Sequence, residues 1–146
     1  MKNLFFLALL AVPFIAAYTK ENAEPEPALK VELLTGKDWM RTGSTITVNG
    51  VTTDTHATLS ACDKDDYMRF EEAQEMFYDE GASKCSAASP QRIKGVRWVD
   101  DGKMILGMGI SNGHNGAHQV IELSANTLTF AQTIADKRYT YTFTKR

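Results

Sequence analysis

The C-terminal stretch NTLTFAQTIADKRYTYTFTKR, residues 126–146, alternates apolar and polar side chains with a period of two. Successive side chains of a β-strand point to opposite faces, so the alternation predicts two strands, each with one apolar face. The segment ADK between them predicts a hairpin turn. The apolar face carries Leu128, Phe130, Ile134, Tyr139, Tyr141 and Phe143.

The same pattern extends upstream through a series of short segments separated by turn residues. GKMILGMGIS (102–111) follows RIKGVRWV (92–99) across the turn DDG, and AHQVIEL (117–123) comes next. DYMRF (66–70) and EMFYDEG (75–81) predict one more hairpin, and Asn49-Gly50 marks a turn inside TITVNGVTT. No helical period of useful length is present. We therefore expect an all-β protein, an antiparallel up-and-down meander of eight or nine strands that closes into a roughly eight-stranded barrel without exposed edges.

The N-terminus is typical of an export signal. Lys2 precedes the apolar run LFFLALLAVPFIAA, which is shorter than the roughly 20 residues of a membrane-spanning helix. We expect a signal peptide over 1–17, a mature chain that starts near Tyr18, a flexible linker over 18–30 and one barrel domain over 31–146. The exported protein is expected to be periplasmic or extracellular, soluble, without a stable membrane anchor, and monomeric. A formal charge of −2 for the chain favours neither nucleic acid nor an acidic membrane surface as a partner.

Cys62 and Cys85 are the only cysteines and bracket eight of the 18 acidic residues. Two thiols in an oxidising compartment tend to pair, and the hairpin pattern between them brings their ends together, so we expect a disulfide. Closing this loop stabilises the fold by about 3 kcal/mol in the chain-entropy model. A calcium loop is the weaker interpretation of the acids, because Met68 stands where an EF-type loop needs glycine.

The other candidates for chemistry are dispersed. His114 and His118 are four residues apart and, on a strand, stand about 13 Å apart, too far to share a metal ion. All three histidines, including His56, are therefore expected in surface loops. No nucleophile elbow, phosphate loop or dinucleotide fingerprint is present. We expect no catalytic residues, no metal and no cofactor.

Several pieces occur in an order that resembles the bacterial secreted lipocalin-like domain family, from about Leu33 to the C-terminus. They are LLTGKDWM (33–40), Cys62 with DKDD, a strand ending in Phe70, DEGASKC (79–85) and KGVRWVDDGK (94–103). Gly36 and Trp39 match the glycine and tryptophan of the first barrel strand, one residue further apart than the usual Gly-x-Trp. The resemblance implies an eight-stranded up-and-down barrel and, for most members, an unassigned function or presumed small-ligand binding. Many members are lipoproteins, whereas this chain lacks the lipidation cysteine.

One consistent register points a set of apolar side chains of the C-terminal strands inward. An eight-stranded barrel is either filled by its side chains or holds one small ligand, and the sequence leaves both open. The leading hypothesis is an exported, non-catalytic module that binds a small apolar ligand or serves a protein partner in the cell envelope. The alternative is a hydrolase that uses carboxylates of the acidic hairpin, such as Asp66 and Glu72. The expected ligand-binding residues are Met104, Leu106, Met108, Val120, Phe130, Tyr139 and Tyr141.

Overall fold

The computed structural model describes residues 29–72, 74–100, 103–108 and 115–146. The expected signal peptide (1–17) and the linker up to residue 28 lie outside these residues, as does His114. The described chain forms nine strands: β1 (Asp38–Val48), β2 (Val51–Asp54), β3 (Tyr67–Phe70), β4 (Glu75–Asp79), β5 (Arg92–Asp100), β6 (Lys103–Met108), β7 (Gly116–Leu123), β8 (Thr127–Ile134) and β9 (Lys137–Lys145).

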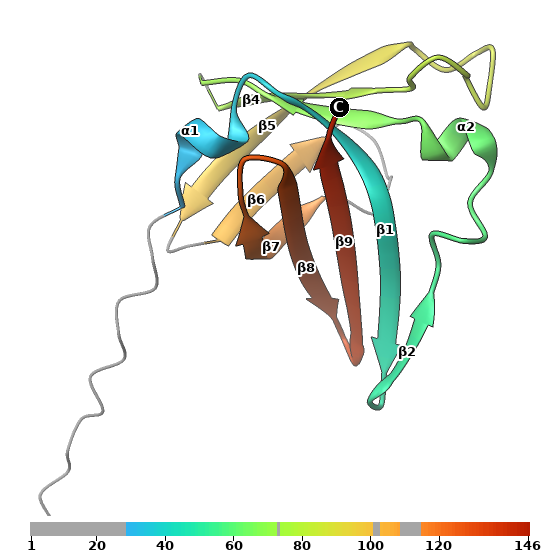
Figure 1. Ribbon diagram of the computed structural model, residues 1–146, viewed down its shortest axis with the longest axis vertical. Coiled ribbons are helices and arrows are strands. Elements are labelled where there is room, and N and C mark those ends of the chain that lie inside the picture. Colours follow the sequence, from blue (N-terminus) through green and yellow to red (C-terminus); the bar gives the residue numbers. More distant parts are fainter. Residues whose placement is uncertain (1–28, 73, 101–102, 109–114) are drawn as a thin grey trace, which may run out of the picture.

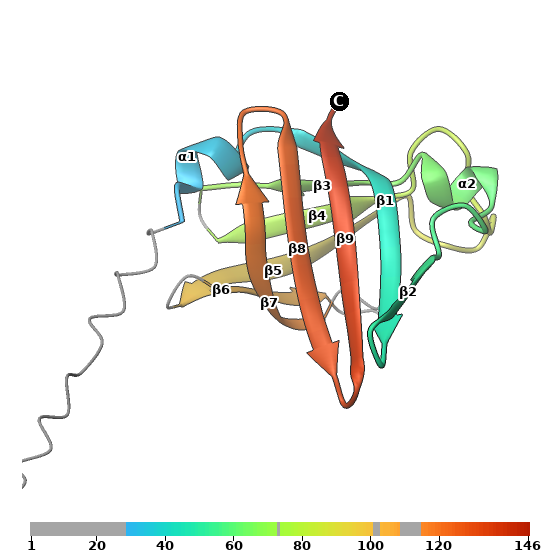
Figure 2. The same ribbon diagram turned by 60° about the horizontal axis from the view of Figure 1, so that its bottom comes forward.

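The strands form a closed antiparallel meander (Figures 1 and 2). From β3 to β9 each strand pairs with the next one in the chain, and β1 pairs with both β3 and β9. The hydrogen bonds therefore ring round eight strands, with β2 attached outside the ring to the second half of β1. This confirms the predicted all-β, roughly eight-stranded barrel.

The turn chemistry explains why neighbouring strands pair in this order. Asn49 and Gly50, between β1 and β2, both have positive φ, of 50° and 78°. Two-residue hairpins need this backbone, which glycine adopts freely and asparagine tolerates. Ala135 also takes a positive φ, of 54°, in the turn between β8 and β9. These hairpins place the predicted apolar residues of β8 and β9 opposite one another, with Phe130 facing Tyr141.

Two helices of one turn each interrupt the strands, although the sequence showed no helical period. α1 (Val31–Leu34) precedes β1 and covers one end of the barrel, called the α1 end below (Figure 2). Leu34 is fully buried there, and its carbonyl accepts a hydrogen bond of 2.8 Å from Trp39 Nε1. The backbone N–H of Gly36, with φ of 68°, donates to the carbonyl of Phe70. These bonds hold α1 against the first and third strands.

α2 (Ala61–Lys64) lies in the connection between β2 and β3. Ser60 caps it, because the Ser60 hydroxyl accepts the backbone N–H of Asp63 at 3.2 Å. The connection packs beside β1 where the short pairing with β3 stops. There the backbone N–H groups of Thr55 and His56 both donate to the Ser44 carbonyl. These backbone hydrogen bonds extend the contact with β1 by one residue beyond its pairing with β2.

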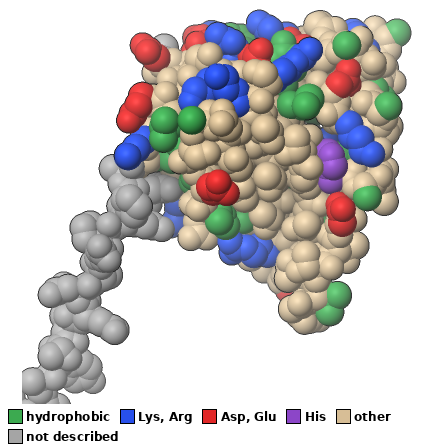
Figure 3. Space-filling model, viewed as in Figure 1, with side chains coloured by type: hydrophobic (Ala, Val, Ile, Leu, Met, Phe, Trp, Pro, Cys, Tyr) green, Lys and Arg blue, Asp and Glu red, His purple; other side chains and the backbone are tan. Residues whose placement is uncertain are grey.

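The surface of the described residues mixes both signs of charge. On the face shown in Figure 3, basic and acidic side chains are interspersed and hydrophobic ones are scattered. None of the described helices has the length and apolar character to cross a membrane.

Candidate functional site: the barrel interior

The predicted ligand-binding residues lie mostly in or against the buried core. Met104, Leu106 and Phe130 are at most 1% exposed. Val120 and Tyr141 are partly buried and pack against this core. Tyr139 is half-buried and pairs with Ile46 and Gln132, and the Met108 backbone pairs with Gly95, while the Met108 side chain lies outside the described part. Whether these residues bind a ligand stays a prediction.

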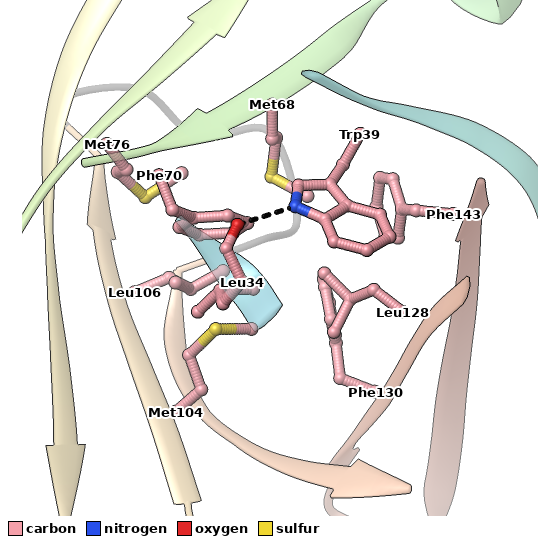
Figure 4. Close-up of a cluster of buried hydrophobic side chains, with 10 residues drawn as sticks. All are labelled: Leu34, Trp39, Met68, Phe70, Met76, Met104, Leu106, Leu128, Phe130 and Phe143. Atoms are coloured by element: carbon pink, nitrogen blue, oxygen red, sulfur yellow. Dashed lines mark hydrogen bonds between the residues drawn. The ribbon is translucent and has the colours of Figure 1, made fainter. Parts of the chain in front are cut away.

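Side chains fill the interior at the α1 end (Figure 4). The Phe130 ring stacks on Phe143 with centroids 5.1 Å apart and lies tilted against Tyr141 at 5.6 Å. Offset and tilted aromatic pairs of this kind add to the stabilisation from apolar burial. The buried cluster consists of Leu34, Trp39, Met68, Phe70, Met76, Met104, Leu106, Leu128, Phe130 and Phe143.

Next to this apolar cluster lies a polar group formed by Arg41, Asp66 and Tyr78. The alternation that buries Met68 and Phe70 also directs Asp66 inward, and only 6% of Asp66 is exposed. Tyr78 follows Met76 on the inward face of β4, and its hydroxyl donates to Asp66 Oδ2. Arg41 Nη2 donates to the Asp63 carbonyl at 3.1 Å. Asp66 is therefore a buried carboxyl group and not a solvated surface acid of the hairpin.

Burial dominates the electrostatics of this pair. It raises the pKa of Asp66 from an ordinary value near 3.8 to about 6, although the Tyr78 hydrogen bond and the charge of Arg41 favour the ionised form. Burial, and then the hydrogen bond to Asp66, also raise the pKa of Tyr78 well above its usual range. At neutral pH the phenol is therefore a donor, and Asp66 is a carboxylate close to its titration range.

Several buried polar atoms around this group have no hydrogen-bond partner among the described residues. They include the donor Arg41 Nε and the acceptors Asp66 Oδ1 and Glu80 Oε2, and also His56 Nδ1. Buried polar atoms in folded proteins are almost always satisfied, by protein, water or a ligand. This region therefore has hydrogen-bonding capacity that its own side chains do not use.

His118 and Gln132 contribute two more acceptors of this kind. His118 is fully buried, edge-on to Phe130 with ring centroids 4.8 Å apart, so the prediction that it is a surface histidine is wrong. Its Nε2 has no partner, and neither has Gln132 Oε1. The sequence contains a signal for this burial, because His118 is two residues from the apolar Val120 and therefore faces the same side of the strand.

A buried cation also lies on the inward face of β5. Arg97 is 2% exposed, and its Nη2 donates to the Glu71 carbonyl in the turn between β3 and β4. Burial lowers the pKa of the Arg97 guanidinium. Arg97 was not predicted to be buried, although it lies opposite the inward-facing Leu106 on an alternating strand.

The acidic hairpin is braced by the predicted disulfide. Cys62 in α2 and Cys85 in the connection between β4 and β5 are joined, with Cα atoms 5.2 Å apart. The Asp65 carboxylate accepts backbone N–H groups of Ala82 and Ser83, at 2.9 and 2.8 Å, across the same junction. Among the described residues, the cluster with metal-ligand spacing is formed by these two cysteines and Asp63, and the disulfide consumes both thiols.

Other acids of the hairpin are held in ion pairs or face solvent. Asp79 accepts hydrogen bonds from Arg92 and Gln91, both at 2.9 Å, and these bonds lower its pKa against the opposing effect of burial. Glu72 is exposed and lines a surface hollow of about 510 Å³ at the α1 end, beside Glu32 and Glu71. Asp66 precedes β3 and Glu72 follows it, which separates their backbones by about 20 Å at the rise of a strand. These two carboxylates therefore do not form a catalytic pair.

No protein-family model matches the chain, and no curated protein is significantly similar to it.

Proposed function

We propose that this chain is an exported, non-catalytic, lipocalin-like module that binds a small, largely apolar ligand inside its barrel. The lipocalin-like assignment rests on the order of the sequence pieces from Leu33 onward, and the closed ring of eight strands is compatible with it. Export is supported by the apolar N-terminal run and by the disulfide between Cys62 and Cys85.

The observation that carries the binding proposal is the unused hydrogen-bonding capacity inside the ring. A core that served packing alone would be apolar, because an unsatisfied buried polar group costs about 1–3 kcal/mol. This interior holds Arg41 Nε, Asp66 Oδ1 and His118 Nε2 beside a large apolar cluster. A molecule with an apolar body and a polar group satisfies both surfaces at once.

Uptake of 11-(dansylamino)undecanoic acid tests the proposal. We expect one site per chain, detected as enhanced dansyl fluorescence. Val120→Trp adds volume beside the core and should weaken uptake with little loss of stability if the interior has room for a ligand. Ile121→Trp is the matched control, because Ile121 is 51% exposed and should leave uptake unchanged.

A filled interior gives a different pair of results. Overpacking would then make Val120→Trp cost about 1–3 kcal/mol, and the parent protein would not take up the probe. That combination contradicts the binding proposal and leaves a role as an accessory protein for an envelope partner.

The hydrolase remains the alternative, and the state of Asp66 is the observation in its favour. A carboxyl group with a pKa of about 6 in a buried site suits a general acid. Asp66→Asn separates the two functions, because it removes acid–base chemistry but keeps an acceptor oxygen and nearly the same side-chain size beside the apolar binding surface. Loss of a measured hydrolytic activity with unchanged probe uptake would favour the enzyme.

Export is tested by the mass of the secreted product. The mature protein should begin at or within a residue or two of Tyr18. A product that retains Lys2 would contradict cleavage of a signal peptide.

A further inference from the structure

Two side chains on neighbouring strands are fixed by adjacent backbone carbonyls at the start of β7. His118 Nδ1 lies 2.9 Å from the carbonyl oxygen of Gly116, and Gln132 Nε2 donates to the carbonyl oxygen of Asn115 at 2.8 Å. β7 and β8 pair through Val120 with Phe130 and Gln119 with Ala131, and one further step of the same register sets His118 opposite Gln132. Opposite residues of antiparallel strands have Cβ atoms about 4.5–5.5 Å apart.

The contact with Gly116 sets the tautomer of His118. A carbonyl oxygen only accepts hydrogen bonds, so Nδ1 carries the proton. Burial lowers the pKa of the ring, against the effect of the nearby carbonyls of Gly116 and Met104, and so favours the neutral form. Nε2 then has a lone pair and no proton. It is buried, and no group donates to it among the described residues.

Gln132 is oriented in the same way. Its amide nitrogen is the group that can donate to Asn115, which assigns the other end of the amide, Oε1, as an acceptor. Oε1 is buried and no donor reaches it. Gly116 makes room for this arrangement, because a Cβ at that position would lie 2.5 Å from Gln132 Nε2.

We propose that His118 Nε2 and Gln132 Oε1 form an acceptor pair that recognises an O–H or N–H donor group on the molecule bound in the barrel. The inference rests on the proposed binding function and specifies the ligand, which is an apolar molecule that carries a hydroxyl or an ammonium group. A ligand whose polar group only accepts hydrogen bonds, such as an ether or a carboxylate, leaves both atoms unsatisfied and gains no affinity from them.

Two isomers of one formula provide the test. 1-Octanol and 1-methoxyheptane have the same atoms and nearly the same apolar body, but the ether lacks the donor. We expect calorimetric titration to show that octanol binds at least about fivefold more tightly, since an unsatisfied buried acceptor costs 1 kcal/mol or more. Octylamine distinguishes an ammonium preference from a hydroxyl preference, and octanoate should bind more weakly than octanol.

The variants assign the preference to this pair of residues. Gln132→Leu and His118→Leu should each bring the ratio of octanol to ether affinity toward one. Gln119→Leu makes the same chemical change on the exposed side of β7 and should keep the ratio. Side-chain ¹⁵N spectra of the parent protein should show His118 protonated at Nδ1, a result that does not depend on any variant folding.

Each outcome has a distinct meaning. If both isomers bind equally, the inference is wrong although the binding function stands, and water then satisfies the two acceptors. An Nε2-protonated His118 overturns the inference as well. If neither isomer binds and the dansyl probe is also not taken up, the proposed function itself fails and takes this inference with it.

Discussion

Replacing Asp66 by asparagine should stabilise the protein above neutral pH. The folded state raises the pKa of this carboxyl from near 3.8 to about 6, mainly through burial, so the ionised form is the unfavourable one. At about 1.36 kcal/mol per pKa unit, the ionised carboxylate costs the fold about 3 kcal/mol. Asparagine keeps an acceptor for the Tyr78 hydroxyl and removes the charge. We expect Asp66→Asn to gain about 2–3 kcal/mol at pH 8, or ~10 °C in Tm.

The stabilising effect of Asp66→Asn should increase with pH. Because the folded pKa is the higher one, protonated Asp66 contributes its full stability below about pH 4, and this stability is lost as the pH rises through about 6. The advantage of Asp66→Asn should therefore vanish near pH 4 and reach a plateau above about pH 7. Urea unfolding of both proteins across this pH range measures the difference between their free energies of unfolding. The contributions of the other titrating groups are the same in both proteins and cancel in this difference.

Asp136→Asn is the control for the loss of one negative charge. Asp136 is exposed in the turn between β8 and β9, so its replacement should change the free energy of unfolding by less than about 0.5 kcal/mol at either pH. If Asp66→Asn is neutral or destabilising at pH 8, the ionised carboxylate is well compensated in the fold, and burial does not govern its titration.

Reduction of the bond between Cys62 and Cys85 should cost about 3 kcal/mol of stability, measured as a lower Tm, and an unchanged Tm would mean that the bond constrains little. Gly81→Ala should lower the free energy of unfolding by more than about 1 kcal/mol in urea, because Gly81 has φ of 65° and an added Cβ would lie 2.3 Å from the Asp65 carbonyl oxygen. A neutral result would show that the backbone around Asp65 and Gly81 shifts freely. Trp39→Phe leaves a buried carbonyl at the end of α1 without its donor and should cost about 1–3 kcal/mol, and a smaller loss would indicate that α1 is held by apolar contacts alone.

The sequence predicted the barrel because its strands alternate clearly and its turns are short. The hairpin of β8 and β9, the Asn49-Gly50 turn and the disulfide were all readable from local patterns. The closure of the ring by β1 and β9 followed from the general rule that edges are avoided, not from any residue.

The polar interior was not predicted from the sequence, because polar residue types are usually exposed even though strand alternation places these ones inward. Asp66 and His118 are polar and lie near turns, so solvent exposure was the natural expectation. Their positions on alternating strands nevertheless match Met68 and Val120, which point inward. The partners that make these residues informative, Tyr78 and the Gly116 carbonyl, come from other strands or from backbone geometry, which local patterns do not predict.

The pairing of the first ring strand with the last constrains how the chain folds. β1 and β9 form nine residue pairs, from Trp39 with Lys145 to Val48 with Lys137, and nearly the whole domain separates them in sequence. Contacts of such long range form late, since the entropy of closing the loop must be met before they contribute. The ring therefore cannot close until β9 has left the ribosome, and a chain that lacks β9 exposes two strand edges to aggregation.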